Sequence, residues 1–225
     1  FSLADRKNVS FLYEASVAGG IPIIKTLKSL LLGNNITKIS GILNGTTNYI
    51  LSNMTNNKIS FNNALIEAKK NGYAESNPDL DIEGVDSAHK LSILSSLAFT
   101  SKFTDFKNIY KEGISKIDTL DIDFANKLNL TIKLLAVAEL QDNHLVQYVK
   151  PMLIDKNSQL GQVSDVLNGI QISSEKSGNI FLEGEGAGGM ATASSIISDI
   201  GTLCLESATS SLGIKQDSLK KINEL

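Results

Sequence analysis

Residues 72–100 read GYAESNPDLDIEGVDSAHKLSILSSLAFT, and their second half has the apolar periodicity of a long helix. The stretch opens on a Gly-Tyr-Ala-Glu turn and passes through a Pro-Asp-Leu-Asp segment that disfavours a helix. Asp86 and Lys90 are four residues apart, so they share one helical face, which continues to Ile93 and Leu97. Because a solvated ion pair would continue into charged residues, we expect this pair to point into the wall of a cleft.

Acidic residues crowd the sequence before Lys90. Glu75, Asp79, Asp81 and Asp86 all fall within the sixteen residues that end at this lysine. An acid–lysine pair at helical spacing is most often a surface salt bridge that contributes about 0.3–0.5 kcal/mol. Asp81 could equally serve only as the N-cap of the helix. The spacing alone therefore leaves a catalytic lysine and an exposed ion pair both open.

The composition is that of an ordinary globular chain. The 225 residues include 42% hydrophobic and 20% charged residues, which suits one domain, or one and a half, with a sizeable core. The net charge is −3 and the pI is near 5.5, which argues against nucleic acid or a membrane surface as partner. The sequence contains no recognisable signal peptide and no apolar run of the ~20 residues that a bilayer needs.

Cys204 is the single cysteine of the chain. It excludes an internal disulfide and fits a cytoplasmic location, where thiols stay reduced. Its neighbours Leu203 and Leu205 lead us to expect that it packs in the core.

Hydrophobic periodicity predicts a mixture of strands and helices along the chain. We expect strands over residues 8–16, 36–43, 107–110, 129–140, 145–154, 171–173 and 179–183. We expect helices over residues 22–32, 47–54, 61–71, from about 82 onward, and over 121–128, 161–167 and 191–206. The order lacks regular βαβ alternation, so we predict an α+β fold, a mixed β-sheet with helices on one face. The remainder, to Leu225, is polar and is expected to be helical or frayed.

Five collinear motifs, spread from about residue 10 to residue 200, together resemble homoserine dehydrogenase. They are YEASVAGGIPII at 13–24, GILNGTTNYIL at 41–51, GYAE at 72–75, D-x-E-G-x-D-x-A-x-K at 81–90 and GEGAGGMATAS at 184–194. The chain has no Gly-x-Gly-x-x-Gly near its start and no initiator methionine. It therefore looks like the substrate-binding and dimerisation region of that family, without the N-terminal nucleotide-binding half.

The resemblance implies a division of the chain into three parts. Residues 1–18 would be the last part of the nucleotide-binding domain, and residues 19–185 would be the substrate-binding and dimerisation domain. Residues 186–225 would return to the nucleotide-binding domain and form a C-terminal tail. The fold implied is the substrate domain of two-domain dehydrogenases, and the partner implied is a second copy of the chain. The apolar strands at 129–140 and 145–154 are the candidates to form this homodimer.

The reaction implied is the reversible NAD(P)H-dependent reduction of L-aspartate 4-semialdehyde to L-homoserine, in threonine and methionine biosynthesis. Hydride delivery to an aldehyde leaves an alkoxide, which needs a proton and a positive neighbour. Lys90 matches the family's proton donor, and Asp86 would orient it and bind the hydroxyl group. A fragment without the dinucleotide domain is expected to be inactive alone.

The resemblance also assigns residues around the substrate. Glu75 matches the glutamate that holds the substrate's ammonium group, where a fixed positive charge requires a carboxylate. Asp81, Tyr73, Gly45 and Thr46 are further substrate-shell candidates. For Thr46 the alternative is an N-cap, and for Tyr73 it is a core aromatic.

A monovalent cation site, for Na⁺, is implied at Glu14, Val17, Gly19 and Ile21. The family builds this site largely from backbone carbonyls, and flexible glycines allow such carbonyls to converge on a hard ion. The alternative is a tight connection between a strand and a helix.

The glycines at Gly186 and Gly188 precede a predicted helix. Backbone N–H groups at a helix start favour anionic or amide oxygens, although such a turn is often merely flexible. In the family this turn lies against the nicotinamide end of NADP or NAD, with the position of Gly188 closest.

Two other functions stay open at this point. One is the substrate domain of another semialdehyde reductase. The other is a non-enzymatic domain that binds an amino acid and dimerises.

Overall fold

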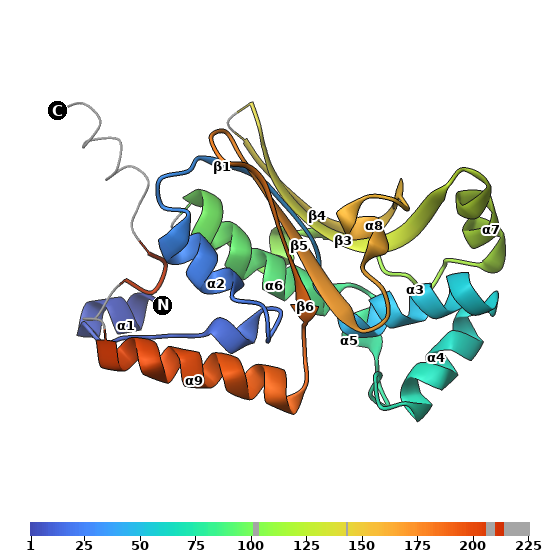
Figure 1. Cartoon of the computed structure of the whole chain (residues 1–225), viewed down its shortest axis with the longest axis horizontal. Coiled ribbons are helices and arrows are strands. Elements are labelled where there is room, and N and C mark those ends of the chain that lie inside the picture. The colour runs from blue at the N-terminus through green and yellow to red at the C-terminus, as the bar shows by residue number, and fades with distance from the viewer. Residues whose placement is uncertain (101–103, 143, 206–209, 214–225) are drawn as a thin grey trace.

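The computed structural model describes residues 1–100, 104–142, 144–205 and 210–213. A six-stranded sheet runs through the middle of the molecule in the order β2-β4-β3-β1-β5-β6 (Figure 1). The strands are β1 (Ile36–Ile42), β2 (Tyr110–Lys111), β3 (Leu130–Gln141), β4 (His144–Asp155), β5 (Leu167–Ser174) and β6 (Gly178–Glu185). Only β2 and β4 pair in parallel, and the other neighbours are antiparallel. The prediction of an α+β fold with a mixed sheet is confirmed.

The chain also forms helices and short helical turns. They are α1 (Ser2–Lys7), η1 (Glu14–Ser16), α2 (Ile23–Lys25), η2 (Thr26–Leu30), α3 (Gly45–Asn57), α4 (Phe61–Lys70), α5 (Asp79–Ile82), α6 (Val85–Ser95), η3 (Ser96–Thr100), η4 (Phe106–Asn108), α7 (Thr119–Lys127), α8 (Gln159–Gln162) and α9 (Gly189–Leu205). α9 lies apart from the sheet, beside α1 and the N-terminal segment (Figure 1). No helix among the described residues has both the length and the apolar character needed to cross a membrane.

Strand β3 divides its side chains between two apolar clusters. Ile132 and Leu134 join the main core, to which α3 and α6 also contribute. Leu135 and Val137 point to the other face of the sheet, where they pack with Leu160 of α8. Most helices therefore cover one face of the sheet, as predicted, and the short α8 covers part of the other.

The long helix predicted from about residue 82 is interrupted. α5 ends at Ile82, and Gly84 adopts a positive φ of 76° before α6 begins. This left-handed conformation favours glycine, and a Cβ at Gly84 would lie 3.0 Å from a methyl group of Val149. The break turns the chain so that α5 and α6 approach the end of β1 separately.

Three other expectations from the sequence are wrong. The strand expected over 8–16 is irregular chain followed by η1; Val9 and Phe11 alternate with polar residues but are exposed rather than paired in the sheet. The short helix expected at 161–167 forms earlier, at α8, because Ser158 accepts a hydrogen bond from the N–H of Gly161. Cys204 is exposed on α9 and does not pack in the core.

Two further expectations concern the segment at 107–110 and the C-terminus. The strand expected at 107–110 is mostly η4, with pairing restricted to the two residues of β2. The expectation of a helical or frayed C-terminus falls largely on residues 206–209 and 214–225, which lie outside the described residues.

Candidate active site

Asn44 joins the end of β1 to two acidic residues. Its Oδ1 accepts a hydrogen bond from the N–H of Thr47 at 2.9 Å, which makes Asn44 the N-cap of α3. Its Nδ2 donates to Oδ1 of Asp81 at 2.7 Å and to Oδ2 of Asp86 at 2.9 Å. Asn44 therefore holds the carboxylates of α5 and α6 together at the start of α3. The sequence analysis missed this residue, although Asn-Gly-Thr-Thr is a recognisable helix-start pattern.

Lys90 and Asp86 form the ion pair that the sequence predicts. Nζ of Lys90 donates to Oδ2 of Asp86 at 2.8 Å and to the carbonyl oxygen of Leu43, also at 2.8 Å. The side chains are 19% and 30% exposed, so the pair is neither solvated nor sealed in the core. An ammonium group has three donors, and two of them have these partners.

A cavity of about 480 Å³ opens beside this pair. Its lining residues are Asn44, Gly45, Thr46, Gly72, Tyr73, Asp81, Asp86, Lys90, Val166, Asn168, Glu185, Gly186, Ala187 and Gly188. The structure thus brings together the residues proposed for catalysis, most of the substrate shell and both glycines of the proposed cofactor turn.

Glu75 lies in an adjoining cavity of about 180 Å³, which it shares with Asp81, Asp86 and His89. Its side chain is exposed. Asp81 and Asp86 line both cavities, so Glu75 is next to the main cavity rather than in its wall. Asp79, the fourth acidic residue before Lys90, is exposed, and the lining of neither cavity includes it.

The alternatives considered for three substrate-shell residues are wrong. Thr46 is not an N-cap, because Asn44 has that role; its hydroxyl donates to the carbonyl oxygen of Tyr73 at 2.6 Å. Tyr73 is not a core aromatic, because it is 44% exposed, with its ring against Tyr49. Asp81 does not cap α6, because Gly84 occupies that position.

The two glycine-rich turns lie against each other. The N–H of Gly19 donates to the carbonyl oxygen of Gly186, and the N–H of Gly20 donates to that of Glu185, both at 2.9 Å. Gly188 has a φ of 115°, and a Cβ there would meet no atom within 4 Å. The wall formed by the second turn is therefore open at Gly188.

Asn168 is a second residue that the sequence analysis missed. It is 1% exposed, lines the main cavity, and neither of its amide atoms has a hydrogen-bond partner among the described residues. Gly186 packs directly over it, since a Cβ at Gly186 would lie 2.2 Å from the amide. Buried polar groups are normally paired, so this amide is an unsatisfied polar group in the wall of the cavity. No local pattern in the sequence distinguishes this asparagine.

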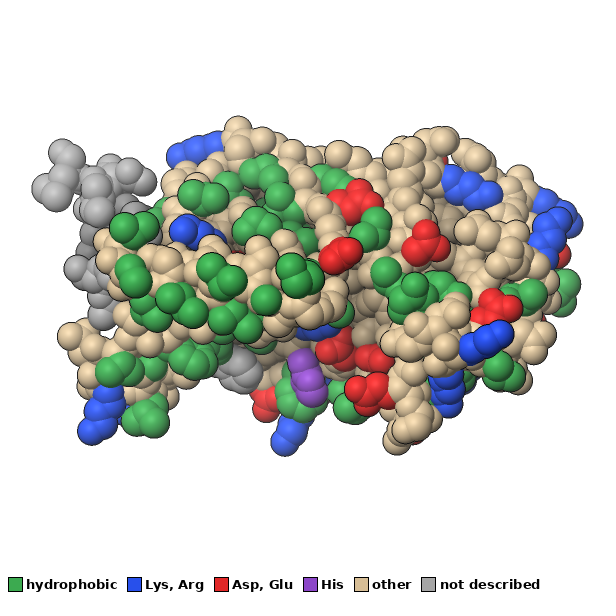
Figure 2. Space-filling model, turned by 60° about the horizontal axis from the view of Figure 1, so that its bottom comes forward, with side chains coloured by type: hydrophobic (Ala, Val, Ile, Leu, Met, Phe, Trp, Pro, Cys, Tyr) green, Lys and Arg blue, Asp and Glu red, His purple; other side chains and the backbone are tan. Residues whose placement is uncertain are grey.

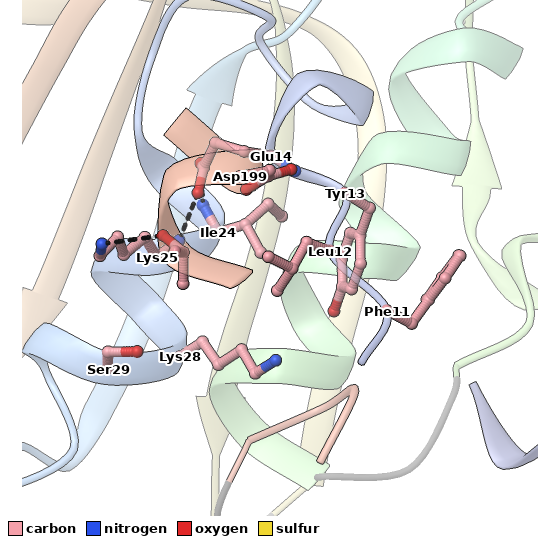
Figure 3. Close-up of a pocket in the computed structure, with 10 residues that line it drawn as sticks. Phe11, Leu12, Tyr13, Glu14, Ile24, Lys25, Lys28, Ser29 and Asp199 are labelled. Atoms are coloured by element: carbon pink, nitrogen blue, oxygen red, sulfur yellow. Dashed lines mark hydrogen bonds between the residues drawn. The ribbon is translucent and has the colours of Figure 1, made fainter. Parts of the chain in front are cut away.

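The side chain of Glu14 has a structural role (Figure 3). Its carboxylate oxygens accept hydrogen bonds from the N–H groups of Ile24 and Lys25, both at 2.8 Å, at the start of α2. Burial raises the pKa of the Glu14 carboxyl, and these two hydrogen bonds oppose that rise. The side chain is therefore committed to helix α2, and a cation at this turn would have to use the backbone carbonyl of Glu14.

The other predicted cation residues lie in the same turn. Val17 and Ile21 are buried, and the carbonyl oxygen of Gly19 accepts a hydrogen bond from the Ser195 hydroxyl at 2.6 Å. A search of the described residues finds no group of three or more His, Cys, Asp or Glu side chains that could hold a metal ion. The turn thus fits a cation only through carbonyl oxygens.

The sequence of this chain matches one protein family. The family model "Homoserine dehydrogenase" matches residues 22–200. Homoserine dehydrogenases of Helicobacter pylori and Neisseria gonorrhoeae are each 44% identical, over 93% and 89% of this chain and 49% and 46% of their own length. The chain therefore spans about half the length of the curated relatives it matches.

Solved structures agree. A homoserine dehydrogenase from Thiobacillus denitrificans superposes with a TM-score of 0.87 at 41% identity, over 89% of this chain and 46% of that one. A hyperthermophilic archaeal homoserine dehydrogenase mutant, solved in complex with NADPH, superposes with a TM-score of 0.77 at 29% identity. That match covers 92% of this chain and 60% of the other.

Proposed function

Because this chain belongs to the homoserine dehydrogenase family, we propose that its cavity carries the proton transfer in the reduction of L-aspartate 4-semialdehyde to L-homoserine. The observation that supports this most directly is the Lys90–Asp86 pair, held by Asn44 and facing an open cavity of substrate size. A purely structural ion pair would need neither the cavity nor the second carboxylate, Asp81, on the same asparagine.

The proton comes from Lys90. NADPH or NADH, when bound, supplies the hydride that adds to the aldehyde carbon. The aldehyde oxygen then carries the negative charge, and the third N–H of Lys90 is available to donate a proton to it. Asp86 and the carbonyl oxygen of Leu43 fix the position of Nζ, so the donor is oriented before the substrate arrives. In the reverse direction Lys90 takes the hydroxyl proton of homoserine.

The cavity also matches the two fixed charges of an α-amino acid. The carboxylates of Asp81 and Glu75 border the two adjoining cavities and can pair with the ammonium group. The substrate carboxylate needs hydrogen-bond donors instead. Gly45 and Thr46 contribute them at the start of the 13-residue helix α3, and Asn168 adds an unpaired amide beside them.

The cofactor would lie against the turn at Gly186 and Gly188. These residues fit a flat ring or an amide group because neither carries a side chain and Gly188 is open. The relative solved in complex with NADPH supports a nicotinamide cofactor at this turn. At this turn the chain leaves room for the cofactor, and the Asn168 amide lies beneath Gly186.

The proposed domain division has support in the surface of α9. Hydrophobic side chains gather over this helix (Figure 2). The large exposed apolar residues on it are Met190, Ile196, Ile197, Ile200, Leu203 and Leu205, and Val9 and Phe11 are exposed in the N-terminal segment. Exposed patches of this kind mark an interface, so we assign residues 1–18 and 186–225 to a nucleotide-binding domain and residues 19–185 to the substrate domain.

The proposed homodimer would use the second face of the sheet. Among the described residues, α8 covers part of that face, and Tyr148, Met152, Ile154 and Phe181 are partly exposed there. A sheet face with apolar side chains is stabilised when a second layer covers it. Strands β3 and β4, the two proposed from the sequence, contribute apolar side chains to this face.

We also assign a Na⁺ site to the carbonyl oxygens of Glu14, Val17, Gly19 and Ile21. They share one buried turn with a left-handed residue, Ala18, at φ 51°. Flexible glycines in such a turn allow several backbone carbonyls to converge on a hard ion.

The decisive test is homoserine-dependent reduction of NADP⁺ and NAD⁺ by the product of the full reading frame that encodes this chain. We expect turnover in the wild type and a loss of at least about a hundredfold in Lys90→Ala. Lys38→Ala is the matched control, because Lys38 forms only a surface pair with Glu139. Equal turnover in Lys90→Ala would remove Lys90 from the mechanism, and no turnover with either cofactor would reject the function.

Substrate identity has a separate test that needs no cofactor. Calorimetric titration of homoserine into the chain should give saturable binding that Glu75→Gln weakens about tenfold or more. If the variant loses homoserine but gains another amino acid, the chain belongs to a different semialdehyde reductase.

A further inference from the structure

A second polar cavity, of about 260 Å³, lies at the other end of α3. Its lining residues are Ser52, Thr55 and Asn56 from α3, Thr131 and Lys133 from β3, and Lys156, Gly161 and Ser164 from the segments around α8. Two lysines and four hydroxyl groups therefore face one space, and its lining contains no carboxylate. The proposed function assigns no role to this cavity.

Lys133 is a buried lysine without an ion pair among the described residues. It is 4% exposed, and its Nζ donates to Oδ1 of Asn48 at 2.9 Å and to the carbonyl oxygen of Val163 at 2.6 Å. Both acceptors are neutral, and one N–H of the ammonium is left for the cavity. Burial lowers the pKa of Lys133 to about 8, and the exposed carboxylate of Asp165 opposes that change. Buried charges are normally compensated by a partner.

Two further donors of the cavity are available, on Lys156 and Ser52, whereas the hydroxyl groups of Thr55 and Ser164 donate to the carbonyl oxygen of Leu51 and to Asp165. Lys156 is half-buried and forms no ion pair within the part of the chain that the structure describes. The hydroxyl oxygen of Ser52 accepts a hydrogen bond from the N–H of Asp165 at 3.3 Å, which leaves the hydroxyl proton free to donate. The cavity therefore offers several donors, two of them charged, and its lining contains no anion; the neighbouring carboxylate of Asp165 accepts a hydrogen bond from Ser164 and forms no ion pair with either lysine.

We propose that this cavity binds a phosphate group, with Lys133 and Lys156 as its two cationic contacts. Two ammonium groups match the charge of a phosphate dianion, and lysine binds phosphate as a point charge. The hydroxyl groups of Ser52 and Thr131 supply neutral donors to the remaining oxygens. The volume accommodates the phosphate and a small organic remainder.

The cavity shares its walls with the candidate active site. Helix α3 begins at the catalytic cavity and lines the phosphate cavity with its last turns. The segment that follows α8 provides Ser164 to one cavity and Val166 and Asn168 to the other. Asn48, which receives the Lys133 hydrogen bond, donates to the carbonyl oxygens of Val163 and Leu167 in the same segment.

A simpler explanation is that Lys133 only connects β3 to α3. That role would require the two hydrogen bonds of Lys133 but would not involve Lys156 or a phosphate ion. The two explanations therefore differ in what Lys156 does, and Lys156 can be changed with little effect on the fold because it is half-buried and makes no internal ion pair.

The experiment is a calorimetric titration of inorganic phosphate into the 225-residue chain at pH 7, with ionic strength held constant by chloride. We expect saturable binding to the wild type, and Lys156→Ala should weaken it by at least tenfold with an unchanged melting temperature in the absence of phosphate. Lys176→Ala, at an exposed turn, is the control for loss of one charge and should bind as the wild type does. No saturable binding, or equal binding by Lys156→Ala, would overturn the proposal.

A second variant and a second ion make the test specific. Lys133→Met should abolish phosphate binding, and its circular dichroism checks that the fold is retained. Acetate at the same ionic strength should bind much more weakly than phosphate, and tighter binding of acetate would overturn the assignment of a phosphate group. Neither homoserine nor a nicotinamide cofactor enters these measurements, so their outcome is independent of the proposed function.

Discussion

The two ends of α3 face cavities with opposite charge. At its first turn, Asp81 and Asp86 converge on the cap residue Asn44, and at its last turns Lys133 and Lys156 converge on a hydroxyl-rich space. Both sets of charges have the sign that the helix dipole favours, negative at the start and positive at the end. The two ends differ in whether the charged side chains have a partner of opposite charge in the same cavity. The acidic end contains its own cation, Lys90, whereas the lining of the basic end contains no anion.

The ammonium groups of Lys90 and Lys133 differ in their partners and in their burial. Lys90 is held by a carboxylate in a partly exposed position, so its charge has a partner and its Nζ lies within reach of the cavity. Lys133 is held by neutral acceptors in a buried position, so its charge is destabilised. The first arrangement suits repeated proton transfer, and the second suits recognition of an anion.

The largest expected effect is at the acidic end. Asp86→Asn removes the charge that holds Lys90 and leaves Asn44 with a neutral partner, so we expect turnover to fall two to three orders of magnitude in the full-length enzyme. Asp79→Asn is the matched control, because Asp79 is an exposed neighbour outside both cavities, and it should retain nearly full activity. Similar losses in both variants would mean that general charge, and not the pair with Lys90, matters.

The next largest expected effect is a pH dependence of stability that comes from Lys133 at the basic end. The pKa of Lys133 is about 8 in the folded chain, below the unfolded value near 10.4, so the unfolded state binds more protons between these two values. The contribution of Lys133 to stability therefore rises with pH across this window, by about 2–3 kcal/mol, and is constant below pH 8.

Urea unfolding of wild type and Lys133→Met, from pH 7 to pH 10, measures this contribution as the difference between the two pH profiles. Lys176→Met, at an exposed lysine, should keep the wild-type profile. A wild-type slope in Lys133→Met would mean that other groups titrate in its place.

A smaller effect is expected at the glycine turn that walls the acidic cavity. Gly186→Ala would push a Cβ into the amide of Asn168, and we expect a loss of about 1–3 kcal/mol of unfolding free energy. Combining it with Asn168→Ala should recover part of that loss in a double-mutant cycle. Gly201→Ala, in α9 with nothing within 4 Å of the new Cβ, should instead stabilise the helix. Strictly additive losses in the cycle would contradict the contact.

The smallest effect compares two helix caps. Asn44→Ala should cost about 1–2 kcal/mol of stability, because α3 loses the hydrogen bond to the N–H of Thr47 and the carboxylates of Asp81 and Asp86 lose a shared donor. Ser60→Ala, at the start of α4, removes a longer bond of 3.4 Å and should cost less. Thermal unfolding of the two variants gives the ranking, and a larger loss in Ser60→Ala would mean that Asn44 serves the cavity without stabilising α3.

Local patterns in the sequence were sufficient for the regular parts of the fold. The alternating and apolar runs at 129–140 and 145–154 correspond closely to β3 and β4, and the glycine after residue 71 marks the end of α4. The N-terminal segment was mispredicted because Val9 and Phe11 alternate as they would in a strand, while no strand among the described residues pairs with them.

The sequence alone determined the pairing of Asp86 with Lys90, because helical spacing puts the two residues on one face wherever that helix lies. It also indicated the motifs at 13–24, 41–51 and 184–194, which identify the family. Only the tertiary structure decided that Asn44 connects two acidic helices, that Gly186 covers an unpaired Asn168, and that Lys133 and Lys156 share a cavity. These contacts join residues far apart in the chain, and their distances depend on how the sheet and α3 pack, which no local pattern records.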